Sequence, residues 1–376
     1  MKKVKNQIIY LLLAVLMFWS CNSKNEKIQP DEWTFGQDVY VAGYENKTQE
    51  NSIARLWKNG KVQHLESGQD NILNSSGDYE LHSSKAFSVF ISDNDVYVAG
   101  YEKFVKEFPH PNGAHWEYIS KARLWKNGIM QDLANDDVID YAVSVFVSDG
   151  DVYVLGYQAH EYPGVIYLKL WKNGVPEIFA EVRSDFQPRA LFVSDGDVYV
   201  AGYGEFYSFG EGLNIKAKLW KNGIEEELEI GKKSYAYSVF VSDGDVYVGG
   251  SNNKEAALWK NGRLETIANG EYFSEVRWVY ISGDDIYLAG HIDLNARLWK
   301  NGIEQNLLDA KNATLFYSVF KIDEDVFLAG YESIVNDLGD GLAFVYSKAY
   351  LYKNGRKLNL DLGHSIGSEA YSIFVK

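Results

Sequence analysis

One short pattern is repeated seven times along this chain. Each copy has a segment resembling Val-Tyr-Val-Ala-Gly-Tyr, a connection of variable length, and a segment of the form Leu-Trp-Lys-Asn-Gly. The second segment falls at residues 56–60, 124–128, 170–174, 219–223, 258–262, 298–302 and 351–355, the last with Tyr352 in place of Trp. One such unit is too small to bury its apolar faces alone. The repeat therefore predicts an array of similar units packed side by side.

Each copy contains four strand-like segments separated by turn dipeptides. In the copy that starts at Ser238 they are residues 238–242, 245–250, 256–260 and 263–267, where β-branched and aromatic residues alternate with polar ones. Asn-Gly separates the third and fourth segments in every copy and suits a type I′ hairpin turn. Each copy is thus predicted to form a four-stranded antiparallel blade.

The spacing of the copies and the two ends of the chain indicate how the blades are arranged. The second segments begin at Val39, Val96, Val152, Val198, Val246, Ile286 and Val326, a mean spacing of roughly 48 residues that suits propeller blades. The first copy lacks a first strand, and residues 371–375 are a first strand with nothing after it. We expect this C-terminal innermost strand to pair with residues 39–42. The predicted fold is all-β, a seven-bladed β-propeller of four-stranded antiparallel blades, with the C-terminal strand completing the first blade.

This closure resembles that of WD-repeat and kelch propellers, although the motifs of those families are absent. The chain most resembles uncharacterised bacterial lipoproteins with Trp-Lys-Asn-Gly propeller repeats. That resemblance implies a propeller and a membrane anchor, but no activity.

The N-terminus differs from the rest of the chain. Lys2, Lys3 and Lys5 precede an apolar run at residues 8–19, which is too short to span a bilayer and suits an export signal. Cys21, the only cysteine, follows Ser20 where lipoproteins carry their lipidated residue. We predict a signal peptide at 1–20, lipidation of Cys21, a tether at 21–32 and the propeller at 33–376. The alternative is a stray cysteine beside a later cleavage site.

The predicted location is the cell envelope, as an outer-membrane lipoprotein whose face of the membrane is left open. The lipid would be the only contact with the membrane. The formal net charge is −15, with no basic stripe, which excludes nucleic acid as a partner. The seven histidines share no ligand spacing, so neither a metal nor any other cofactor is predicted.

The conserved position of one aromatic residue within the repeats indicates a structural role. Tryptophan occupies the same strand position at 57, 125, 171, 220, 259 and 299. Packing between adjacent blades explains this regularity better than stacking on a sugar does.

Function in a repeat protein is expected where the copies differ. The connections after the second and fourth strands lie at one end of the blades and vary in length, so that end is the predicted binding face. Its aromatic residues include Tyr101, Phe104, Trp116, Tyr162, Phe206, Tyr207 and Tyr346. Exposed, they would suit a glycan or a protein partner. The alternative is that they pack only against neighbouring hairpins.

A second difference occurs at the start of the first strand, which lines the central channel. The aligned residues are Phe87, Val143, Arg189, Tyr237, Arg277, Tyr317 and Tyr371. We expect Arg189 and Arg277 to bind an anionic group of a ligand, with Trp278 stacking beside them. The alternative is that each arginine pairs with a nearby carboxylate such as Glu275.

The predicted function is that of an exported, lipid-anchored, non-catalytic binding or scaffold module whose ligand is a glycan or a peptide. No catalytic residue is predicted. One alternative is a glycan-cleaving enzyme, which would need two convergent carboxylates or a His/Tyr/Arg cluster at the channel mouth. Another is a structural subunit of an outer-membrane complex.

Overall fold

Every regular element of the described structure is a β-strand. The computed structural model describes residues 36–48, 51–67, 83–110, 113–133, 139–159, 165–182, 185–208, 212–307, 314–339, 342–360 and 365–376. The predicted signal peptide, Cys21 and the tether lie outside these residues. In the described part of the chain, no helix is long and apolar enough to cross a membrane.

Five repeats form separate four-stranded antiparallel sheets within the unit Gln37–Lys376. The first contains β28 (Gly367–Val375), β1 (Val39–Asn46), β2 (Ser52–Lys58) and β3 (Lys61–Gln63). The second contains β4 (Ser83–Ser92), β5 (Asp95–His110), β6 (Gly113–Lys126) and β7 (Ile129–Asp132). The third contains β8 (Ile139–Ser148), β9 (Asp151–Ala159), β10 (Ile166–Lys172) and β11 (Val175–Val182). The fourth contains β12 (Asp185–Ser194), β13 (Asp197–Ser208), β14 (Gly212–Lys221) and β15 (Ile224–Glu226), and the fifth β16 (Ser234–Ser242), β17 (Asp245–Asn252), β18 (Glu255–Lys260) and β19 (Arg263–Ala268).

The last two repeats share one eight-stranded sheet. It contains β20 (Ser274–Ser282), β21 (Asp285–Ile292), β22 (Asn295–Lys300), β23 (Ile303–Glu304), β24 (Thr314–Ile322), β25 (Asp325–Gly339), β26 (Leu342–Lys353) and β27 (Arg356–Asn359). The two repeats are joined because Asn295 of β22 pairs in parallel with Thr314 of β24. The prediction of seven four-stranded blades is therefore wrong. The fold is an all-β propeller with five separate four-stranded blades, and its hydrogen-bonded pairing continues from the sixth repeat into the seventh.

The C-terminal strand completes the first sheet, as predicted. β28 pairs antiparallel with β1 from Val39↔Val375 to Ala42↔Ser372. Asp38 and Lys376 extend this pairing with backbone hydrogen bonds of 2.8 and 2.9 Å. The two ends of the unit are thus held together by a strand pair.

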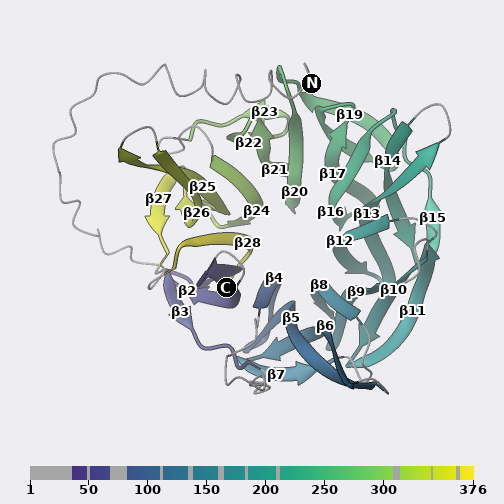
Figure 1. Ribbon diagram of the computed structural model, residues 1–376. Helices are drawn as coiled ribbons and strands as arrows, with labels where there is room; N and C mark the ends of the chain where they lie inside the picture. The colour runs from purple at the N-terminus through teal and green to yellow at the C-terminus, as the bar shows by residue number, and fades with distance from the viewer. Residues whose placement is uncertain are drawn as a thin grey trace, which may run out of the picture. The chain divides into compact units, whose positions relative to one another are not determined.

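The first strand of each repeat lies nearest the centre of the propeller (Figure 1). These inner strands are β28, β4, β8, β12, β16, β20 and β24. Each contacts the next one, and β24 contacts β28. They form a continuous wall around the central channel.

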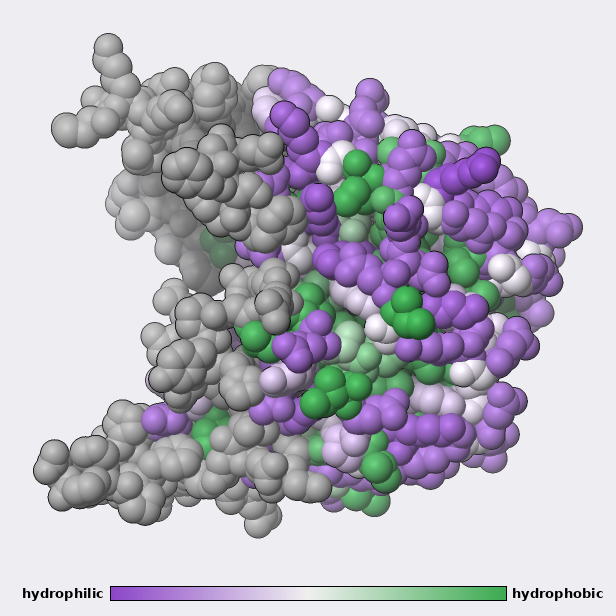
Figure 2. Space-filling view, turned by 90° about the vertical axis from the view of Figure 1, so that its right-hand side faces the viewer, coloured by the Kyte–Doolittle hydropathy of each residue, from purple (hydrophilic) through white to green (hydrophobic). Residues whose placement is uncertain are grey.

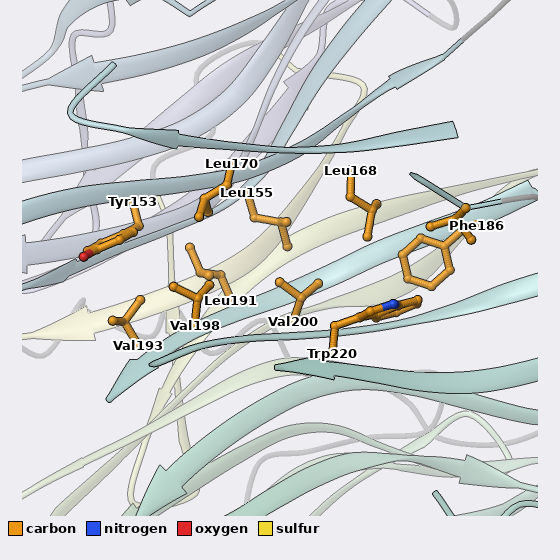
Figure 3. Close-up of a cluster of buried hydrophobic side chains, with 11 residues drawn as sticks. Tyr153, Leu155, Leu168, Leu170, Phe186, Leu191, Val193, Val198, Val200 and Trp220 are labelled. Carbon is orange, nitrogen blue, oxygen red and sulfur yellow. The ribbon is translucent and has the colours of Figure 1, made fainter. Parts of the chain in front are cut away.

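The core lies between neighbouring blades. Figure 3 shows one such layer, in which Leu155, Leu168 and Leu170 of the third blade face Leu191, Val200 and Trp220 of the fourth. The six repeated tryptophans are at most 3% exposed. The indole N–H groups of Trp125, Trp171 and Trp259 each donate to a carbonyl of the preceding blade at 2.7–2.8 Å. The predicted role of the tryptophans in packing between blades is confirmed.

Polar residues cover most of the described surface seen in Figure 2, and hydrophobic residues lie among them singly or in small groups. This distribution is ordinary for a folded domain. The hairpin turns between third and fourth strands follow the predicted chemistry, since both residues of these seven Asn-Gly turns have positive φ.

Each inner strand contains a β-bulge at the same place. One residue of the inner strand is skipped in the pairing with the second strand of its repeat. The skipped residues are Phe87, Val143, Arg189, Tyr237, Arg277, Tyr317 and Tyr371. Bulges change the direction of a side chain, and all seven of these residues line the central cavity.

A glycine in each second strand allows the bulge to form. A Cβ atom at Gly250 would lie 1.8 Å from the carbonyl oxygen of Tyr235, and the equivalent glycines would meet a backbone oxygen at 1.9–2.4 Å. These are Gly43, Gly100, Gly156, Gly202, Gly290 and Gly330. The glycine of the repeated Ala-Gly-Tyr sequence is thus required by close approach of the two strands.

A closed ring of aromatic side chains surrounds the channel nearer its tight-turn end. Successive ring centroids lie 4.6–5.5 Å apart in the order Phe90, Phe146, Phe192, Phe240, Tyr280, Phe320, Phe374 and back to Phe90. Such tilted aromatic pairs each contribute about 0.5–1.5 kcal/mol beyond their buried area. The ring ties the inner strands together and narrows the channel.

Substitution of a bulge glycine tests this account. Gly250→Ala should lower the free energy of unfolding by about 1–3 kcal/mol, because the new methyl group meets backbone that has no room to move. Urea unfolding followed by tryptophan fluorescence measures the change. Gly36→Ala, whose Cβ would meet no atom within 4 Å, is the control. Equal stability of the two variants would contradict the account.

Candidate functional site

A cavity of about 360 Å³ lies at the mouth of the channel, at the end where the variable connections are. Besides the seven bulge residues, it is lined by Tyr101, Tyr141, Tyr157, Gln187, Pro188 and Trp278. A second cavity of about 90 Å³ is lined by the aromatic ring and shares Trp278 with the first. The channel therefore narrows sharply below the mouth.

One side of the mouth is a continuous series of aromatic rings. They follow in the order Tyr157, Tyr141, Tyr101, Phe87, Tyr371 and Tyr317, with successive centroids 4.9–5.7 Å apart. Rings that are packed edge to face or stacked in this way hold one another in place. The mouth is therefore a rigid wall of aromatic faces and phenol groups.

Arg277 is held by rings and by a buried carboxylate. Its guanidinium lies 4.1 Å from the centroid of Tyr237 and 5.2 Å from that of Tyr317. Its Nε donates to Glu275, a fully buried residue that also contacts His291 Nε2 at 2.9 Å. The predicted alternative of pairing with Glu275 is thus what the structure shows for Arg277.

Electrostatics keeps this pair ionised. Burial opposes the charge of Glu275, but Arg277 and His291 lower the pKa of its carboxyl below the usual value. Burial also opposes the charge of Arg277, yet Glu275 raises its pKa. The charges of Glu275 and Arg277 cancel at the mouth.

Arg189 has a different environment. Its side chain is exposed, and its Nη2 donates to Gln187 Oε1 at 3.1 Å and to Tyr203 Oη at 2.6 Å. Its guanidinium lies 5.1 Å from the centroid of the Tyr203 ring. In the described structure neither a carboxylate nor any acceptor for Nε and Nη1 lies within bonding distance of it. Arg189 therefore presents a positive charge with free donors to the cavity.

Five phenols of the mouth are held in the protonated form by burial. Burial raises the pKa of Tyr101 to about 12 and raises those of Tyr157, Tyr237, Tyr317 and Tyr371 as well. A protonated phenol both donates and accepts a hydrogen bond. The lining thus offers neutral polar groups next to one free cation.

Of the predicted site residues, Arg189, Arg277, Trp278 and Tyr101 come together in this cavity. Phe104 is only 7% exposed and lies under Lys121, so it packs inside its own blade. Tyr346 is half-buried and is not among the lining residues. The side chains of Trp116, Phe206 and Tyr207, and all of Tyr162, lie outside the described structure.

The sequence prediction missed Tyr141 and Gln187. Tyr141 and Gln187 stand two residues before the bulge, where the repeats carry Lys85, Tyr235, Glu275, Leu315 and Glu369. The variety of side chains at this aligned position is the sequence feature that could have pointed to Tyr141 and Gln187. Tyr203 follows the repeated glycine at the variable end, as Tyr101 does, but the sequence could not show its hydrogen bond to Arg189.

No group of three or more potential metal-ligating side chains occurs among the residues that the structure describes. The chemistry of the mouth consists of guanidinium, phenol, amide and indole groups.

Comparison with known proteins shows similarity in architecture only. No family model and no curated protein matches the sequence. The structure is similar to the β-propeller domain of the Trilobed protease from Pyrococcus furiosus, with a TM-score of 0.41 and 12% identity over 75% of this chain and 97% of that one. It is also similar to the computationally designed Ika8 protein, with a TM-score of 0.40 and 13% identity over 75% and 78% of the two chains. For Trypanosoma rangeli sialidase the TM-score is 0.39 and the identity 10%, over 71% of this chain and 50% of that one. With TM-scores and identities this low, these similarities do not indicate what the cavity binds.

Neutralising Glu275 should destabilise the fold. Glu275→Gln is expected to lower the free energy of unfolding by about 3 kcal/mol. This value lies at the low end of the range for breaking a buried ion pair, because Arg277 is 25% exposed. Folding lowers the pKa of Glu275, so its stabilisation is complete above about pH 4.5 and is lost as pH falls. Urea unfolding at pH 7 and at pH 4 measures both effects.

The matched control is Glu304→Gln, which removes the exposed partner of Arg297. A surface pair of this kind contributes about 0–1 kcal/mol. Equal losses in the two variants would show that the Glu275 pair is not specially stabilising.

Proposed function

We propose that this protein is a non-catalytic binding module whose ligand, a glycan or a peptide, places an anionic group on Arg189 in the mouth of the propeller. The observation that supports this most is the free guanidinium of Arg189 beside a wall of aromatic rings. Guanidinium groups bind carboxylates through two parallel hydrogen bonds. Aromatic faces add contact area for a sugar ring or an apolar side chain.

The rival function, a glycan-cleaving enzyme, gains one specific observation. Arg277, Tyr237, Tyr317 and His291 form the Arg/Tyr/His cluster that such an enzyme would need, around Glu275. However, no Asp or Glu occurs among the described residues lining the cavity, whereas cleavage usually needs two carboxylates. The raised pKa values of Tyr237 and Tyr317 also disfavour a phenolate nucleophile. Binding is the function that these groups favour.

We also propose that the module is anchored to the outer membrane through a lipid on Cys21, as a member of the lipoproteins with Trp-Lys-Asn-Gly repeats. The support is the sequence alone, namely the basic and apolar N-terminus and the single cysteine. Several acyl chains on one cysteine would give stable attachment.

Loss of the free guanidinium should weaken binding. Screening the full chain against glycan and peptide arrays should yield ligands whose affinity falls roughly 10- to 100-fold in Arg189→Ala, since charge-assisted hydrogen bonds are lost. Arg297→Ala, which removes an arginine paired with Glu304, is the control and should bind normally. Turnover of any bound glycan would instead favour the enzyme.

Removing the predicted lipidation residue tests the anchor. Cys21→Ser should prevent incorporation of labelled palmitate and shift the protein from the membrane fraction to the soluble fraction of cells. Cell fractionation with immunoblotting measures the shift. Unchanged membrane association of the variant would disprove the lipid anchor.

A further inference from the structure

We infer that the mouth cavity selects the terminal acidic residue of a glycan, a hydroxylated sugar ring that carries one carboxylate. This inference rests on the proposed function and names its ligand class. Four features of the cavity support it: one free guanidinium, neutral hydrogen-bonding groups, a described lining without Asp or Glu, and a much smaller cavity below the mouth.

The charge of the cavity matches a single anion. Arg189 and Arg277 are the two cationic residues among those that line the cavity, and Arg277 is neutralised by Glu275. The guanidinium of Arg189 has unfilled donors on Nε and Nη1, which matches one carboxylate. Two parallel hydrogen bonds would also use Nη2, with the carboxylate replacing the neutral acceptor Gln187. A phosphate monoester dianion would be left with excess charge against a chain whose net charge is −15.

The remaining polar groups match hydroxyls. Gln187 and the protonated phenols of Tyr101 and Tyr157 are neutral and can donate and accept. Tyr371 Oη donates to Glu369 Oε2 at 2.8 Å and Tyr237 is hydrogen-bonded to Glu275, so these two phenols can still accept. The rings between them, together with Trp278, provide apolar faces for the C–H side of a sugar. A saturated fatty acid would leave these polar groups unpaired.

A free amino acid fits the cavity poorly because its ammonium group would be left without a partner. Its ammonium group would need an acidic partner, and the described lining residues include neither Asp nor Glu. A buried charge without a partner is costly. The cavity therefore favours a carboxylate without a nearby amine.

The depth of the cavity indicates recognition of a chain end. Its volume of about 360 Å³ lies at the small end of the roughly 300–1,000 Å³ typical of ligand pockets. Below Trp278 the space lined by the aromatic ring is only about 90 Å³. We therefore expect a glycan to enter from the mouth and to present its last residue.

Calorimetry with the purified full chain tests the inference. The probes are a disaccharide that ends in glucuronic acid, its methyl ester, the same disaccharide ending in glucose, and a peptide with a free C-terminal carboxylate. We expect the acid to bind at least roughly tenfold more tightly than the ester and the glucose form. Arg189→Ala should remove this preference. Arg189→Lys should restore it only in part, because lysine lacks the two-pronged geometry.

Each other outcome has a definite meaning. Equal binding of acid and glucose forms, lost in Arg189→Ala, would overturn the acidic-sugar inference while leaving a binding site at the mouth. Preferential binding of the peptide would do the same. Absence of binding by any probe and by the arrays would overturn the proposed function itself. Arg297→Ala, with thermal unfolding of every variant, controls for loss of folding.

Discussion

The close approach between a glycine and a carbonyl oxygen, repeated in every blade, is the constraint on which the structure depends. It lets the inner strand skip one residue in its pairing, so that the skipped side chain faces the channel. With any side chain at Gly250 and its equivalents, the strands would have to separate. The repeated sequence therefore does more than build blades. It also delivers one variable residue per repeat to a common cavity.

The site arises where two repeats depart from that pattern together. In most inner strands the residue after the bulge is serine, and Ser88, Ser144, Ser318 and Ser372 each accept a backbone N–H from the neighbouring inner strand. Ala190 and Trp278 stand at this position beside Arg189 and Arg277, and they interrupt the series. In the described structure Ser238 Oγ is left buried without a partner between them. A buried hydroxyl without a partner is unfavourable, and departures from local sequence rules are expected at functional sites.

Much of the fold could be predicted from residues whose role is local. Asn-Gly turns, alternating strands and the missing first strand led to correct hairpins and the correct pairing of β28 with β1. The shared eight-stranded sheet could not be predicted, because the pairing of Asn295 with Thr314 joins two repeats and has no motif. Alignment located both arginines. It could not show that Glu275 reaches Arg277 whereas Gln187 leaves Arg189 free, because the bulge alters which residues share a face.

The contrast between the acidic chain and the free guanidinium of Arg189 in the mouth cavity bears on selectivity. A net charge of −15 repels polyanions at long range, while salt screens such repulsion over about 8–10 Å. Within the cavity, short-range contacts determine which ligand is favoured, and these contacts come from one free guanidinium among neutral phenols. Burial keeps the phenols of Tyr101 and Tyr157 uncharged, and these two tyrosines of the repeated Gly-Tyr sequence line the cavity, so they offer hydrogen bonds without adding repulsion. For the ligand proposed above, they would therefore favour a single negative charge placed at Arg189.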